Sequence, residues 1–341
     1  MQAIVEITHQ FIHELRSAEN VAGVALASED VTPRLGELVD EAFTNAVLAD
    51  RIAHELDELR VRITPQFEDE PLVKSIRIDL IANGDGKSVY SQSYRRGPWT
   101  REAAHKAAQL REEGSLGENE LPVQMLVALP RGGVDVPLPP LQAPAISETT
   151  LEACGARKLG AGEFVPDRPV LINKRFEEES VIRCEEADVV EAGGAAFGQI
   201  VRLAEPLPGA ETRVVTILSG MLFDARQIGE QTQFHFKPEA LADAQQMCEL
   251  RGFGERVLTV FHTHGWSNKC CNCNQNSGCM IAEAKPSLQD YHLLATLFPG
   301  KSTLMPIAGR KLGAEGRRPL LQVYAWRKGE MRPIRWKQYE D

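Results

Sequence analysis

The sequence predicts a mixed α/β protein in which a C-terminal domain, a mixed β-sheet flanked by helices, follows a small α+β domain. Apolar residues that alternate, as in half-buried strands, are interleaved along the chain with apolar residues at helical spacing. A stretch rich in proline and glycine, residues 130–150, separates two parts of the chain. The length of 341 residues, 43% of them hydrophobic, suffices for two globular cores.

These observations predict an N-terminal domain over residues 1–135, a linker over residues 136–160 and a second domain over residues 161–341. The linker contains Pro137, Pro139 and Pro140, which favour an extended and semi-stiff chain.

The N-terminal domain combines helical and alternating patterns. Its expected helices and strands are helices over 1–20, 34–60 and 100–112, strands over 75–81 and 88–94 joined by a turn at 83–86, and a strand over 123–129. In the second domain we expect strands over 169–173, near 181–183, and over 196–203, 213–218, 233–236, 257–264, 304–308 and 320–326, with helices over 238–251 and after Asp290. Helix and strand both remain open for the segment that leads into Glu191.

Charge and hydropathy exclude several classes of function. The net charge is −10 and there is no long basic run, which disfavours a nucleic-acid partner or an anionic membrane surface. No apolar run of about 18 residues is present, so no membrane span is expected. The N-terminus lacks the features of a secretory signal, and the seven cysteines are unevenly spaced. We therefore expect a cytoplasmic protein with free or metal-binding thiols.

The chemistry is concentrated between His262 and Asp290. His262 and His264 alternate at a strand end, so their side chains point the same way. Ser287 and Asp290 are three residues apart at a helix start and share a face. Two imidazoles and one carboxylate leave a fourth coordination position open, which is typical of catalytic zinc.

These residues, in this order, resemble the His-x-His and Ser-x-x-Asp motif of the JAMM metalloproteases, also called the JAB, MPN-plus or Mov34 family. The family also has an upstream glutamate in a Glu-x-x-Gly-x-x-x-Gly setting, which Glu191, Gly194 and Gly198 match. The resemblance covers about residues 165–341. It departs from the family where seven residues usually separate the second histidine from the serine. Here residues 265–286 intervene, an insertion of 15 residues.

The resemblance implies a role for each motif residue. His262, His264 and Asp290 would hold Zn²⁺, Glu191 would act as general base and then general acid, and Ser287 would donate a hydrogen bond to the oxyanion. The implied activity is cleavage of a peptide or isopeptide bond after the C-terminal glycine of a ubiquitin-like protein. It would serve deconjugation or precursor processing in a bacterial conjugation system.

Alternative functions remain open at this stage. One is a peptidase acting on sulfur-carrier proteins, and another is a non-catalytic scaffold or binding module of the same family. Docking of conjugation-pathway enzymes is one expected role of the N-terminal domain, while the absence of cysteine before Cys154 excludes a thioester-forming domain there. A role in DNA repair is disfavoured by the acidic charge.

The insertion, residues 266–285, contains Cys270, Cys271, Cys273 and Cys279. Four thiolates within ten residues are able to hold a second, structural Zn²⁺. Their spacing is tighter than in usual zinc sites, so three cysteines with an outside ligand, redox-active thiols and plain thiols all remain alternatives. In each case the insertion begins next to the expected catalytic metal.

Overall fold

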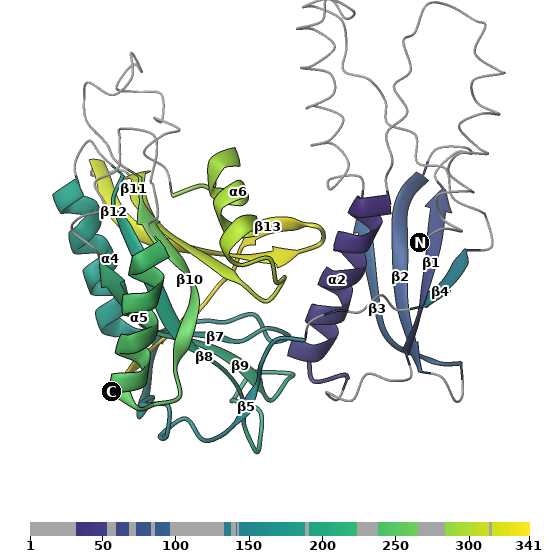
Figure 1. Cartoon of the computed structure of the whole chain (residues 1–341), viewed down its shortest axis with the longest axis horizontal. Helices are drawn as coiled ribbons and strands as arrows, with labels where there is room; N and C mark the ends of the chain where they lie inside the picture. Colours follow the sequence, from purple (N-terminus) through teal and green to yellow (C-terminus); the bar gives the residue numbers. More distant parts are fainter. Residues whose placement is uncertain are drawn as a thin grey trace, which may run out of the picture. The chain divides into compact units, whose positions relative to one another are not determined.

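The computed structural model describes residues 32–52, 59–67, 73–82, 86–95, 133–137, 141, 143–187, 191–223, 238–264, 284–313 and 316–341 (Figure 1). The chain forms two compact units. The first comprises Met1–Val47, Arg51–Ala143 and Arg327–Glu330, and the second comprises Leu48–Asp50, Pro144–Trp326 and Met331–Asp341. The main division, between residues 143 and 144, falls inside the stretch where the sequence predicts a linker. The expected helices over 1–20 and 100–112 and the expected strands over 123–129 and 233–236 lie outside the described residues.

The first unit is an antiparallel sheet with a helix against it. Its elements are α2 (Thr32–Leu48), β1 (Leu59–Phe67), β2 (Val73–Ala82), β3 (Ser88–Arg95) and β4 (Val134–Pro137), with strand order β3-β2-β1-β4. Alternate residues of the strands are buried, among them Ile63 and Ile78. The hydroxyl of buried Tyr94 in β3 donates to the carbonyl of Leu38 in α2 at 2.9 Å. The expected hairpin of strands 75–81 and 88–94 is confirmed as β2 and β3.

The prediction that the helix continues to residue 60 is wrong, because α2 ends at Leu48 and β1 begins at Leu59. Asp50 adopts a left-handed conformation with φ 55°, which aspartate tolerates better than most residues, and the amide of Arg51 bonds back to Ala46. The Asp50 carboxylate accepts from the Nε atoms of Arg202 and Arg213 at 2.9 and 2.6 Å. These distant ion pairs stabilise a turn that the local apolar pattern does not indicate.

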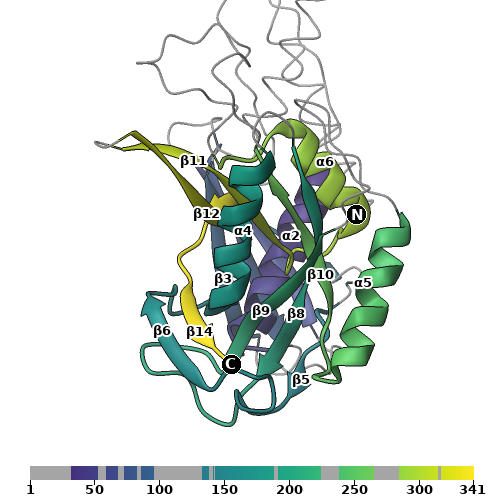
Figure 2. The same ribbon diagram turned by 90° about the vertical axis from the view of Figure 1, so that its left-hand side faces the viewer.

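The second unit is a mixed sheet with helices on both faces, which confirms the expected mixed α/β class. Its strands are β5 (Ser147–Glu148), β6 (Lys158–Gly162), β7 (Val170–Asn173), β8 (Gly193–Arg202), β9 (Val214–Phe223), β10 (Arg256–Thr263), β11 (Leu304–Gly313), β12 (Gly316–Arg327), β13 (Glu330–Pro333) and β14 (Lys337–Glu340). The strand order is β13-β12-β11-β10-β8-β9-β7-β14-β6, with β5 beside β8. Figure 2 shows β14, close to the C-terminus, beside β6.

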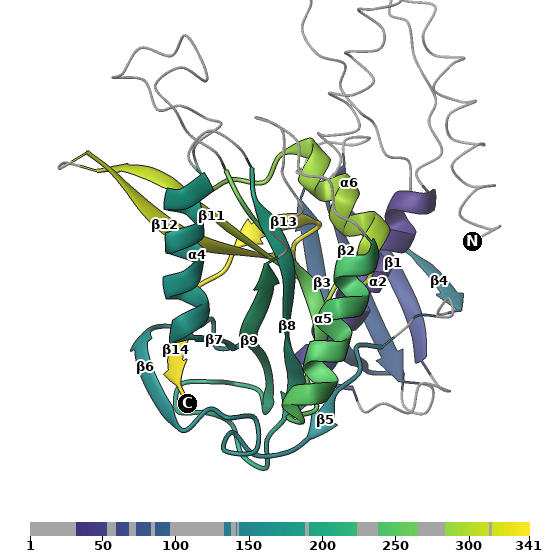
Figure 3. The ribbon, with the colours of Figure 1, turned by 60° about the vertical axis from the view of Figure 1, so that its left-hand side comes forward.

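In the described part of this unit, three helices cover the sheet: α4 (Lys174–Ala187), α5 (Pro238–Arg251) and α6 (Leu288–Leu297). Figure 3 shows α4 on one side of the sheet and α5 and α6 on the other. The core follows this division. Phe176 of α4 packs edge-on against Phe261 of β10, with ring centroids 6.0 Å apart. On the other side, Leu294 of α6 packs with Ile307 of β11. None of the described helices is long and apolar enough to cross a membrane.

The expected strand near residues 181–183 is wrong, because these residues lie within α4. The buried positions Phe176, Ser180 and Cys184 recur every four residues, which is the spacing of a helix face. The Ser180 hydroxyl donates to the carbonyl of Phe176 at 2.7 Å, so a polar residue is accommodated on this buried face. Ile182, which favours the strand interpretation locally, is half exposed.

Two glycines of the motif that begins at Glu191 allow β9 to approach β8 closely. A Cβ atom at Gly194 would lie 2.2 Å from the carbonyl oxygen of Leu222, and one at Gly198 would lie 1.8 Å from that of Ile217. The register between the strands also shifts between Phe197 and Gly198. Backbone atoms block both positions, so no side-chain rotation is able to relieve the clash.

We predict that Gly198→Ala lowers the free energy of unfolding by about 3 kcal/mol, the upper end of the usual cost of overpacking. Chemical denaturation of purified protein measures this change. Gly300→Ala is the matched control in the same unit, because its added Cβ would meet only the Ser302 hydroxyl at 3.8 Å. Equal denaturation midpoints for the two variants would contradict the packing account.

Candidate metal centre

The site lies where β10 ends. The parallel pairing of β10 with β11 places His262 beside Ile307 and Thr263 beside Ala308, inside the sheet. His262 is the next-to-last residue of β10 and His264 follows the strand, with its amide bonded to the carbonyl of Ala308 at 2.8 Å. Both histidines are buried. As predicted from their alternation, their rings lie on one face of the sheet, which is the face covered by α6.

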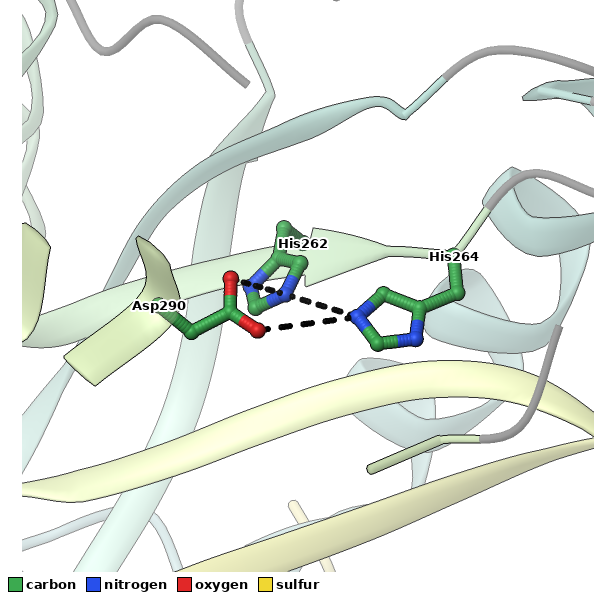
Figure 4. Close-up of side chains that lie close together, drawn as sticks. All are labelled: His262, His264 and Asp290. Carbon is green, nitrogen blue, oxygen red and sulfur yellow. Dashed lines mark hydrogen bonds and ion pairs between the residues drawn. The ribbon is translucent and has the colours of Figure 1, made fainter. Parts of the chain in front are cut away.

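The two imidazole rings and the Asp290 carboxylate point toward one another (Figure 4). The Nε2 atoms of His262 and His264 are 3.3 Å apart. Asp290 Oδ1 lies 3.0 Å from His262 Nε2, and Oδ2 lies 3.7 Å from His264 Nε2. Among the described residues, these three form the group whose ligand atoms all lie within 4.8 Å of one another. The sequence prediction that these residues come together therefore agrees with the geometry.

The spacing of these atoms fits a single tetrahedral metal ion. Zinc bonds to imidazole nitrogen and carboxylate oxygen are about 2.0–2.1 Å long, so the edge of a zinc tetrahedron is about 3.3 Å. The separation of 3.3 Å between the two imidazole nitrogens matches this edge. The contacts to Asp290 use different carboxylate oxygens, Oδ1 at 3.0 Å from His262 and Oδ2 at 3.7 Å from His264, and one ligand atom from each residue lies within 4.8 Å of the others. Two neutral imidazoles and a carboxylate offer electron pairs toward one point, which is the donor chemistry that zinc prefers. The residues present therefore fit the ion that the motif implies.

The start of α6 fixes the carboxylate. Ser287 is the N-cap residue, and its hydroxyl accepts from the amide of Asp290 at 3.2 Å. In return the Ser287 amide donates to Asp290 Oδ2 at 2.5 Å, which completes a capping box. The Asp290 carboxylate is thus part of the helix cap and also one of the three candidate metal ligands. The Ser287 hydroxyl is exposed and acts as an acceptor in this bond, so its proton remains available to a ligand.

A buried tyrosine anchors the chain just before this cap. The hydroxyl of Tyr324 in β12 donates to the carbonyl of Ala284 at 2.5 Å. Ala284 packs in the cluster that contains Leu294 of α6 and Ile307 of β11. The chain therefore returns to a fixed point three residues before Ser287. Nothing in the sequence singles out Tyr324, because its partner lies 40 positions away and no local pattern indicates the contact.

Glu191 reaches the same face through the pairing of β8 with β10. These strands are antiparallel, and His262 lies opposite Gly193. Continuing this register places His264 opposite Glu191, and directly opposite residues share a face of the sheet. Glu191 is half-buried, and this burial raises the pKa of its carboxyl group above the usual value. The nearby histidines oppose the increase, while Asp290 adds to it.

His262 and Asp290 shift each other's pKa values. Burial alone would lower the pKa of His262, but the charges of Asp290 and Glu191 outweigh it and raise that pKa. Burial opposes ionisation of Asp290, yet the histidines and the Ser287 amide hold its pKa well below the usual range. Asp290 is therefore an ionised carboxylate at neutral pH. His262 Nδ1 is buried, and the described residues provide no hydrogen-bond partner for it.

The cysteines of the insertion, Cys270, Cys271, Cys273 and Cys279, lie outside the described residues, so a second zinc site there stays a prediction. The thiols of Cys154, Cys184 and Cys248 are buried and free. Burial raises the pKa of each, that of Cys248 to about 11. These thiols are therefore protonated at neutral pH and are poor metal ligands.

Comparison with known proteins assigns no family to this chain. No protein-family model matches it, and no curated protein matches it. A solution structure of protein DSY2949 from Desulfitobacterium hafniense is 19% identical to it, covers 50% of this chain and 94% of its own, and has a TM-score of 0.30. A similarity at this level establishes neither a shared fold nor a shared activity.

We predict that purified protein contains a zinc ion that is lost in His264→Ala, because two remaining ligands hold the ion far more weakly than three. Elemental analysis of the metal content measures this. Zinc should also raise the thermal unfolding midpoint of the wild type but not of the variant. The stabilisation is about 2.7 kcal/mol when free zinc is 100 times its dissociation constant.

A variant with Cys270, Cys271, Cys273 and Cys279 all changed to Ser is the control, and it should keep the zinc that His264→Ala loses. Zinc that is present in the wild type, absent from the quadruple variant and unaffected by His264→Ala would place the ion on the cysteines instead.

Proposed function

We propose that this chain is a zinc-dependent peptidase of the JAMM type, with His262, His264 and Asp290 as metal ligands. The observation that carries the proposal is the convergence of these three ligand atoms from a strand end and a helix start, beside a half-buried glutamate. A JAMM-type arrangement of the second unit is part of this proposal. The resemblance of the motif residues supports it, and so does the spacing of the ligand atoms.

Bound zinc would supply Lewis acidity, which polarises a carbonyl group and brings the pKa of a water molecule to about 7. The task of Glu191 is to move the proton. Its carboxylate accepts a proton from the attacking water and delivers it to the nitrogen of the leaving amine. Burial raises the pKa of Glu191 toward the range in which one group is able both to accept and to donate near neutral pH.

Ser287 is suited to stabilise charge on the substrate. Its hydroxyl proton is free to point away from the Asp290 amide, toward the carbonyl oxygen that becomes negative during attack. A fixed donor at that position stabilises the transition state more than the ground state. The helix cap holds the serine in place, so the donor needs little reorganisation when the charge develops.

The substrate class follows from the resemblance. We propose cleavage after the C-terminal glycine of a ubiquitin-like protein, which joins it by a peptide or isopeptide bond to a precursor extension or to a conjugated protein. Glycine at the bond to be cut has no side chain, so it allows the carbonyl to approach a buried pair of histidines closely. Among the residues that the structure describes, all five motif positions carry the residue types that this reaction needs, which favours the enzyme over a non-catalytic scaffold.

We predict that Glu191→Gln lowers the rate of zinc-dependent hydrolysis by about 10²–10⁴-fold while zinc content is unchanged, because the amide cannot accept the proton. The assay uses a ubiquitin-like protein ending in Gly-Gly with a fluorogenic amide at its C-terminus. Wild-type protein with full zinc content that hydrolyses no such substrate, whether amide- or isopeptide-linked, would overturn the proposed activity and favour the scaffold.

We predict that Ser287→Gly and Ser287→Ala both reduce the rate by about 10²–10³-fold, because each removes the hydroxyl donor. The two variants separate this role from helix capping. At an N-cap, alanine costs about 1 kcal/mol of stability, whereas glycine costs only a few tenths. Rates and denaturation midpoints of both variants provide the test. A Ser287→Gly enzyme with nearly full activity would show that Ser287 serves only as the cap.

A further inference from the structure

The structure points to Thr263 as a positioning residue for Glu191, an inference that rests on the proposed function. Thr263 stands between the two histidines, but its side chain points to the opposite face of the sheet. It is fully buried there. It therefore has no access to a substrate or a metal ion, and any effect on the reaction must be transmitted through another residue.

Thr263 holds the residue next to Glu191 by two hydrogen bonds. Its amide donates to the carbonyl of Ala192 at 2.6 Å. In a continued antiparallel ladder the amide of Ala192 would donate back to the carbonyl of Thr263. Here the Ala192 amide donates to the Thr263 hydroxyl instead, at 3.0 Å. The Thr263 hydroxyl thus replaces the Thr263 carbonyl as the acceptor of this inter-strand hydrogen bond, at the point where both strands end.

This contact determines where Glu191 stands. No hydrogen bond from a described side chain reaches the Glu191 carboxylate, so its placement depends on the backbone beside it. Ala192 is the adjacent residue and, among the described residues, the last one on this side of β8 with a backbone bond to β10. Without the hydroxyl, the Ala192 amide loses its partner in a partly buried environment, and the chain before Gly193 gains freedom to shift. A displacement of about 1 Å of a reacting group is enough to cost about 10²-fold in rate.

The metal ligands do not depend on this bond in the same way. His262 is paired with Gly193 on one side and with Ile307 on the other, and the His264 amide is bonded to Ala308. Those bonds are made by the backbone of β10, which a change of the Thr263 side chain leaves in place. The inference therefore predicts that Thr263 affects proton transfer and leaves zinc binding unchanged.

Thr263→Val tests this, because valine keeps the shape and removes the hydroxyl. We expect kcat to fall by about 10-fold or more, with KM and zinc content unchanged. Thr263→Ser is the matched control: it keeps the hydroxyl and should stay within about threefold of the wild type. In a Glu191→Gln background, Thr263→Val should cause little further loss, since its effect passes through Glu191.

Amide hydrogen exchange supplies a readout that does not need activity. The Ala192 amide should exchange at least about 10-fold faster in Thr263→Val than in the wild type or in Thr263→Ser. If the wild type is inactive, the proposed function fails, while the exchange result still decides whether Thr263 holds this segment.

Four outcomes would overturn the inference. They are an unchanged exchange rate in Thr263→Val, equal losses in the Val and Ser variants, loss of zinc together with activity, and an undiminished effect in the Glu191→Gln background.

Discussion

The antiparallel register between β8 and β10 is the constraint on which the rest of the candidate site depends. Pairing of His262 with Gly193 brings Glu191, from a segment some 70 residues earlier in the chain, opposite His264. Because side chains alternate between faces, a slip of one residue would turn Glu191 away from the histidines and into the core beneath α4. The close approach of β9 at Gly194 and Gly198 secures β8 on its other edge. The packing of the sheet therefore also sets the geometry of the candidate site.

A second constraint comes from the start of α6, where the helix cap and the candidate metal site use the same carboxylate. Asp290 accepts the Ser287 amide as part of the capping box and presents its oxygens to the histidines. The Ser287 amide donates to this carboxylate, and a neutral imidazole whose Nε2 carries the proton is also able to donate to it. A cation bound between the three groups would instead use all of them as electron-pair donors. The helix cap holds Asp290 in the orientation that such binding needs.

The sequence is informative where the relevant pattern is local. Alternation around His262 and the serine-to-aspartate spacing before α6 predict both elements and the meeting of their side chains. The failures have distant or ambiguous causes. The end of α2 depends on Asp50 bonding to arginines more than 150 residues away. The strand expected near residues 181–183 lies within α4, whose buried stripe includes Ser180, and the hydroxyl of Ser180 is satisfied only within the helix itself. The anchoring of Ala284 by Tyr324 also joins residues that no short window contains.

One face of the sheet forms the apolar core and the other holds the candidate site. This division explains how a buried polar site coexists with a well-packed core. On the α4 face, Phe261 and Thr263 of β10 lie in a closed environment in which apolar contacts and one hydroxyl bond fix the strand. On the α6 face, the buried rings of His262 and His264 point toward one another and toward Asp290. A rigid apolar face holds the strand still, so the polar face does not need its own packing to keep the three candidate ligands close together. Under the proposed function, changes beneath α4 would then alter the chemistry without contact with any reacting group.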